Sequence, residues 1–122
     1  MATILLTGAS RGIGAAARAA LSAAGHRVIG QSTQGGDGLI AADFAALGAA
    51  DALWAQAMDH AGGQIDVLVN NAGVFEAADI GDGAGFAAAW ARSLAINLQA
   101  AADLCRHAVL HFGATGGGRI IN

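Results

Sequence analysis

The chain has 122 residues, of which 55% are hydrophobic and 12% charged, and its formal net charge at pH 7 is −3. This length suits one domain rather than two, and the apolar fraction excludes a disordered tail. The basic residues are scattered arginines, so no basic patch indicates nucleic-acid binding. No apolar run reaches the ~18 residues that a membrane span needs, and no signal peptide is evident. The single cysteine cannot form an internal disulfide, which predicts a cytoplasmic protein.

Short apolar runs alternate with Ala-rich segments along the chain. In chain order we expect a strand at 3–7, a helix at 12–24, strands at 26–30 and 39–42, a helix at 48–61, a strand at 65–69, helical residues from about 85 to 112 with a break near Asn97, and a strand at 119–122. The alternation predicts an α/β fold, a doubly wound parallel sheet of the Rossmann type in the strand order 3-2-1-4-5. A ligand crevice is then expected at the carboxyl ends of the first and fourth strands.

A Gly-rich loop, Thr7-Gly8-Ala9-Ser10-Arg11-Gly12-Ile13-Gly14, joins the first expected strand to the first expected helix. Gly8 would permit a tight turn, Gly12 would let the backbone approach a pyrophosphate, and Gly14 would let the helix pack closely on the strand. The start of the helix would offer free N–H groups to the phosphates. The loop therefore predicts nucleotide binding, with a plain Gly-rich turn as the alternative.

The spacing Thr-Gly-x-x-x-Gly-x-Gly resembles the cofactor loop of the short-chain dehydrogenase/reductase family. Four further features follow in that family's order: Asp43 after the third strand, Asn70-Asn71-Ala72-Gly73 after the fourth, Ile96-Asn97-Leu98 within a helix, and Gly117-Gly118-Arg119-Ile120-Ile121-Asn122 at the fifth. The resemblance extends over the whole chain and is nearest to the 3-oxoacyl-carrier-protein reductase-like branch.

The resemblance implies a set of site residues. Asp43 would hydrogen-bond the adenine ring, and Asn97 would be a catalytic residue whose main-chain carbonyl holds a water of the proton relay; the alternative for Asn97 is a capping or solvated side chain between two helices. No metal site is expected. The residues expected to bind the cofactor are Gly8, Ser10, Arg11, Gly12, Ile13, Gly14, Ser32, Thr33, Asp43, Phe44, Asn71, Ala72 and Gly73.

Cofactor preference depends on the end of the second strand, where NAD-preferring enzymes carry an acidic residue that binds the ribose 2′-hydroxyl. Ser32 occupies that position here, and Thr33 follows it. Arg11 lies where NADP-preferring members of the family carry a basic residue. We therefore favour NADP over NAD. In the alternative, Arg11 is only a solvated loop cation and Asp37 reaches the ribose.

The family's remaining catalytic residues, a Ser after the fifth strand and a later Tyr-x-x-x-Lys, have no counterpart in this chain. It contains no Tyr or Lys, and none of its four serines follows the fifth strand. The resemblance implies an NAD(P)-dependent oxidoreductase that moves hydride between nicotinamide and a small carbonyl or alcohol substrate, in a homo-oligomeric parent. Residues 1–122 would be the dinucleotide-binding half of one Rossmann domain, truncated after the fifth strand and inactive alone. The alternative is a non-catalytic nucleotide-binding module or an inactive fragment.

Several other side chains could carry chemistry. His107 and His111 lie four residues apart and could share a metal, although a solvated helix surface is the preferred interpretation. Asp103 is expected to pair with His107 at that surface. Cys105 is expected to be a core residue rather than a nucleophile, and Trp54 and Trp90 are expected to be packing groups rather than ligand platforms.

Overall fold

The computed structural model describes residues 1–122, whose strands form one parallel sheet. The strands are β1 (Thr3–Leu6), β2 (Arg27–Ser32), β3 (Ile40–Ala41), β4 (Val67–Val69) and β5 (Arg119–Ile121), in the order β3-β2-β1-β4-β5. Each neighbouring pair is parallel. The predicted α/β class and strand order are therefore confirmed.

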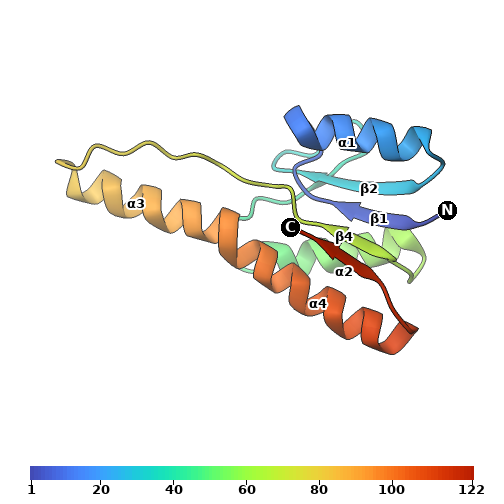
Figure 1. Cartoon of the computed structure of the whole chain (residues 1–122). Helices are drawn as coiled ribbons and strands as arrows, with labels where there is room; N and C mark the ends of the chain where they lie inside the picture. The colour runs from blue at the N-terminus through green and yellow to red at the C-terminus, as the bar shows by residue number, and fades with distance from the viewer.

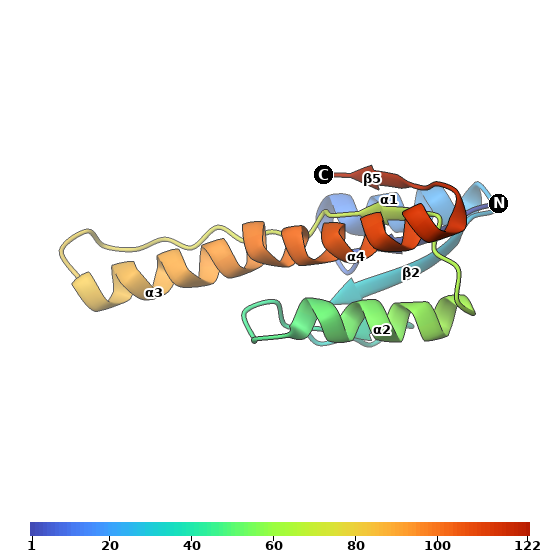
Figure 2. The same cartoon turned by 90° about the horizontal axis from the view of Figure 1, so that it is seen from below.

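The helices cover both faces of the sheet, as a doubly wound fold requires. They are α1 (Gly12–Ala23), α2 (Ala49–Ala61), α3 (Gly83–Leu94) and α4 (Ala100–Thr115), with a π-helical turn η1 (Ala95–Gln99) between the last two. Helix α1 lies on one face, while α2 and α4 lie on the other (Figures 1 and 2). Helix α3 and the segment before it extend side by side away from the sheet (Figure 1). No helix combines the length and the apolar character that a membrane crossing requires.

The main core lies between the sheet and the pair α2 and α4. Leu5, Leu53 and Leu68 are fully buried there, and Leu104 from α4 is 1% exposed. Burial of such side chains is the principal stabilising contribution, about 1.5–3 kcal/mol for each. The core fixes β1 and β4 side by side, so that the loops leaving their carboxyl ends meet.

Two predicted boundaries differ from the structure for physical reasons. Strand β2 continues two residues past Gly30. This glycine does not end the strand but lets its backbone pass close to Ala9, since a Cβ on residue 30 would lie 2.9 Å from the Cβ of Ala9. The helical run does not break near Asn97, since the π-helical turn widens the helix without ending it. The run from α3 through η1 to α4 is therefore continuous.

Candidate functional site

A cavity of about 310 Å³ opens at the carboxyl ends of β1, β2 and β4, where the strand order reverses direction. All thirteen residues expected to bind the cofactor line it: Gly8, Ser10, Arg11, Gly12, Ile13, Gly14, Ser32, Thr33, Asp43, Phe44, Asn71, Ala72 and Gly73. Gln31, Val74, Arg92 and Ile96 complete the lining. The structure thus gathers segments that are far apart in the sequence around one cleft.

The Gly-rich loop has the geometry of an anion cradle. Helix α1 begins at Gly12, and Arg11 provides no side-chain cap, so the first N–H groups of the helix face the cleft without a capping partner. Gly12 has a φ of +55°, and a Cβ there would meet no protein atom, which leaves space beside the loop. A Cβ on Gly14 would overlap the carbonyl oxygen of Gly8, so the loop and helix can approach this closely only with glycine there.

Thr7 bonds the Gly-rich loop to the turn after β4. Its side chain is 1% exposed, and its Oγ1 accepts hydrogen bonds from the N–H groups of Asn71 and Ala72, each at 3.0 Å. The Nδ2 of Asn71 donates in return to the carbonyl oxygens of Thr7 and Gly8, each at 3.1 Å. Four hydrogen bonds therefore hold the two cofactor-side loops together. In the sequence, the indication that Thr7 links these loops is a hydroxyl residue at the end of a buried strand.

Gln31 lines the cleft and was not among the predicted site residues. It is 2% exposed, at the end of β2. Its Oε1 accepts from the N–H of Gly8 at 2.8 Å, and its Nε2 donates to the carbonyl of Ala42 at 2.7 Å. A long polar residue directly after the run Val28-Ile29-Gly30 is the sequence signal that could have identified it.

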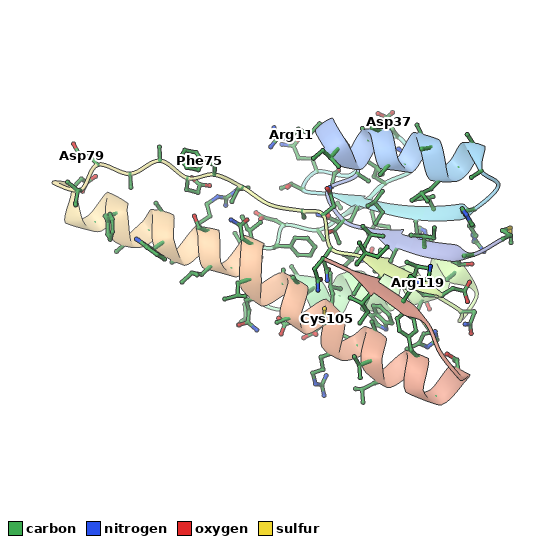
Figure 3. The ribbon with its side chains drawn as sticks, viewed as in Figure 1. Arg11, Asp37, Phe75, Asp79, Cys105 and Arg119 are labelled. Carbon is green, nitrogen blue, oxygen red and sulfur yellow. The ribbon has the colours of Figure 1, made fainter.

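The side of the cleft expected to hold the ribose contains Ser32, Thr33 and Arg11. The Ser32 hydroxyl accepts from the N–H of Gly35 at 2.9 Å, which fixes the following turn. Figure 3 shows Arg11 projecting from the start of α1 into open space. Asp37 does not line the cavity, and its main-chain carbonyl accepts from the Arg18 guanidinium at 2.8 Å.

On the side of the cleft expected to hold the adenine, Asp43 is exposed and one of its carboxylate oxygens accepts from the N–H of Ala45 at 3.0 Å. Phe44 lies beside it, 8% exposed, and belongs to the core cluster. The hydrogen bond to Ala45 fixes the carboxylate, while the packing of Phe44 fixes the backbone. This wall of the cleft is therefore held in place by the core.

Asn97 lies in the π-helical turn, outside the lining of the 310 Å³ cavity. Its Oδ1 accepts from the N–H of Val74 at 2.7 Å, and its Nδ2 donates to the carbonyl of Val74 at 2.8 Å. Val74 lines both this cavity and a neighbouring apolar hollow that contains Asn97 and Trp90. The side chain of Asn97 thus ties the segment after the Asn-Asn-Ala-Gly turn to the long helix.

The histidines of α4 face α2 rather than solvent, so the expectation of a solvated surface was wrong. The Nε2 of His107 lies 2.6 Å from Asp51 Oδ1, and its ring stacks on Trp54 with centroids 5.7 Å apart. The Nε2 of His111 lies 3.1 Å from the carbonyl oxygen of Ile65. Asp103 does not pair with His107, because Asp51 occupies that place. No group of three potential metal ligands is present in the structure.

The structure also shows how far the tryptophans and Cys105 are buried. Trp54 is 7% exposed and belongs to the core, as expected of a packing group. Trp90 is 55% exposed and lies outside the core, which the sequence did not predict. Cys105 is half-buried against the core, as expected of a structural residue, and its Sγ accepts from Asn70 Nδ2 at 3.3 Å. Figure 3 places it on α4, away from the Gly-rich loop.

Comparison with known proteins gives this geometry a family. The model of the short chain dehydrogenase family matches residues 2–122, and the chain belongs to that family. The chain is 37% identical over 139 residues to cis-4-hydroxycyclohexanecarboxylate dehydrogenase of Sinomonas cyclohexanicum, in an alignment covering 97% of this chain and 52% of that protein.

Two solved structures share the fold and contain a nicotinamide cofactor. The 3-alpha-hydroxysteroid dehydrogenase from Pseudomonas sp. B-0831, complexed with NADH, has a TM-score of 0.66 and 35% identity, covering 84% of this chain and 36% of its own. A blue fluorescent protein from a metagenomic library, in complex with NADPH, has a TM-score of 0.73 and 27% identity, covering 86% of this chain and 49% of its own. The chain therefore spans about half the length of these relatives, or less.

Proposed function

We propose that this chain is the cofactor-binding half of an NAD(P)-dependent oxidoreductase that transfers hydride between nicotinamide and a small carbonyl or alcohol substrate. The observation that carries the proposal is the single cleft in which the Gly-rich loop, Asp43 and the Asn-Asn-Ala-Gly turn meet. Membership of the short chain dehydrogenase family and the cofactors of the two solved relatives support it. We further propose that residues 1–122 act as one dinucleotide-binding unit.

The chemistry of the cleft fits a dinucleotide. The N–H groups at the start of α1, beside the open space at Gly12, would hold the pyrophosphate. The carboxylate of Asp43 would accept from the adenine amino group. When bound, the nicotinamide would donate or accept the hydride. Asn97 would serve the proton relay through its main-chain carbonyl, and its position in a π-helical turn supports this, since such turns are frequent at functional sites.

NADP is the proposed preference over NAD. Ser32 and Thr33 bring no carboxylate to the ribose side of the cleft, Arg11 brings a cation, and Asp37 is outside the lining. We expect Ser32→Asp to shift relative affinity toward NAD, because a carboxylate binds ribose hydroxyls and repels a 2′-phosphate. Arg11→Ala should weaken NADP more than NAD. Equal effects on both cofactors in a binding titration would refute this assignment of the 2′ site.

The binding proposal is tested with a matched pair of glycine variants. Gly12→Ala adds a methyl group beside the proposed pyrophosphate position, whereas Gly62→Ala adds one at the end of α2, remote from the cleft. Both glycines have positive φ, +55° and +71°, and neither has a neighbour within 4 Å, so the backbone strain is comparable. We expect NADPH to raise the melting temperature of the wild type and of Gly62→Ala. The shift should be small or absent in Gly12→Ala, and an equal shift in both variants would contradict the proposal.

The 122-residue chain is proposed to bind cofactor without turnover. General acid–base catalysis by a positioned side chain typically supplies roughly 10²–10⁴-fold, and the chain contains neither the Tyr nor the Lys that its family uses for this step. We expect no carbonyl-dependent oxidation of NADPH above background. Turnover of a small ketone by this chain would refute the assignment. The cytoplasmic location and the homo-oligomeric state of the parent stay predictions.

A further inference from the structure

Gln31 joins two parts of the cleft that are separate in the sequence. Through its side chain, Gly8 at the start of the phosphate loop is bonded to Ala42, the residue before Asp43. The main-chain carbonyl of Gln31 also accepts from the N–H of Ala9 at 2.8 Å. Both polar atoms of the side chain therefore bond to main-chain groups of the protein, although Gln31 lines the cavity.

The connection to Ala42 matters because β3 is short. This edge strand contains two residues, which pair with β2 as Gln31 with Ile40 and Ser32 with Ala41. The N–H of the next residue, Ala42, donates to the carbonyl of Ser32 at 3.0 Å. The Gln31 side chain bonds the other main-chain polar group of Ala42, its carbonyl oxygen, which the strand pairing leaves free. It thereby fixes the point at which the chain leaves the sheet toward Asp43 and Phe44.

We propose that Gln31 is a positioning residue that sets the distance between the phosphate loop and the adenine wall. The inference rests on the proposed cofactor binding and specifies how the cleft achieves it. A ligand that carries adenine and phosphates gains from two walls already held at the matching separation, because less ordering is required on binding. A ligand that carries only one of these groups gains little binding affinity from the fixed separation. Gln31 therefore determines how strongly the two halves of an adenine nucleotide reinforce each other.

The test compares Gln31→Met, which keeps the length of the side chain without its polar atoms, with Gln56→Met at an exposed position on α2. The probes are ADP, adenosine and inorganic pyrophosphate, each titrated into the full 122-residue chain by NMR at a temperature where all variants are folded. We expect Gln31→Met to bind ADP at least tenfold more weakly than the wild type. Its affinities for adenosine and pyrophosphate should each change less than threefold, and Gln56→Met should match the wild type throughout.

Gln31→Glu provides a second readout. Its protonated carboxyl can accept from Gly8 and donate to Ala42 as the amide does, and burial raises the pKa of the introduced group. ADP affinity, taken relative to wild type at each pH, should therefore recover in acid and fall as pH rises. If Gln31→Met does not fold, this pH dependence alone decides whether Gln31 has the proposed positioning role.

Uniform losses for all three probes, no loss, or a pH-independent ratio would overturn the role of Gln31. Failure of the wild type to bind ADP would overturn the proposed function itself.

Discussion

Replacing Thr7 by Val removes the hydroxyl that bonds the Gly-rich loop to the turn after β4, while leaving the shape of the side chain nearly unchanged. The N–H groups of Asn71 and Ala72 would both lose their acceptor in a site that is 1% exposed. An unsatisfied buried donor costs about 1–3 kcal/mol, and the extra buried methyl returns about 0.8 kcal/mol. With two such donors, we expect the free energy of unfolding to fall by about 1–5 kcal/mol.

Thr3→Val is the matched control for this prediction. Thr3 begins β1, the strand that Thr7 directly follows, and is 8% exposed, but its hydrogen bond to Asp66 uses the main-chain N–H. Urea denaturation should show a midpoint lowered by roughly 0.5–2.5 M for Thr7→Val at a slope of about 2 kcal/mol/M, and little change for Thr3→Val. Equal stability of the two variants would refute the reasoning that the Thr7 hydroxyl holds the loops together.

Two further predictions concern the stability of the fold. Leu53→Ala, at a fully buried site, should cost about 2–5 kcal/mol in urea denaturation, whereas Leu47→Ala, at a fully exposed site, should cost little; comparable losses would contradict the assigned core. The N–H of Thr3 and then the side chain of Gln64 lower the pKa of Asp66. A folded pKa below the unfolded one stabilises the protein at higher pH, and this contribution is lost as pH falls through the folded value. Stability should therefore drop below about pH 4, and less steeply in Asp66→Asn; an unchanged acid slope would contradict this.

The arrangement of the strands and the cleft could be predicted because the local sequence motifs fall where a parallel sheet places its binding site. The Gly-rich loop follows a buried strand, and a parallel sheet brings the carboxyl ends of its strands to one edge. That rule alone places Asp43 and the Asn-Asn-Ala-Gly turn beside the loop. The structure brings all of them to one cavity.

Contacts between distant elements could not be predicted in this way. Asp103 was expected to pair with His107 because the two are four residues apart on one helix, but packing of α2 against α4 brings Asp51 to within 2.6 Å of His107 instead. The roles of Thr7 and Gln31 likewise depend on which main-chain groups the neighbouring strands present. The sequence predicted a break near Asn97, but it did not distinguish a π-helical turn, which continues the helix, from a helix end.

The measurement that tests the central claim most directly is an amide NMR titration of the 122-residue chain with NADPH. We expect saturable shifts confined to the cleft, at Gly8 to Gly14, Gln31 to Thr33, Asp43 to Phe44 and Asn71 to Val74. The amides between α2 and α4, around Asp51 and His107, serve as the internal control and should not move. Absence of shifts at millimolar NADPH, or shifts centred on α2 and α4, would contradict the assignment of this cleft as a nicotinamide cofactor site.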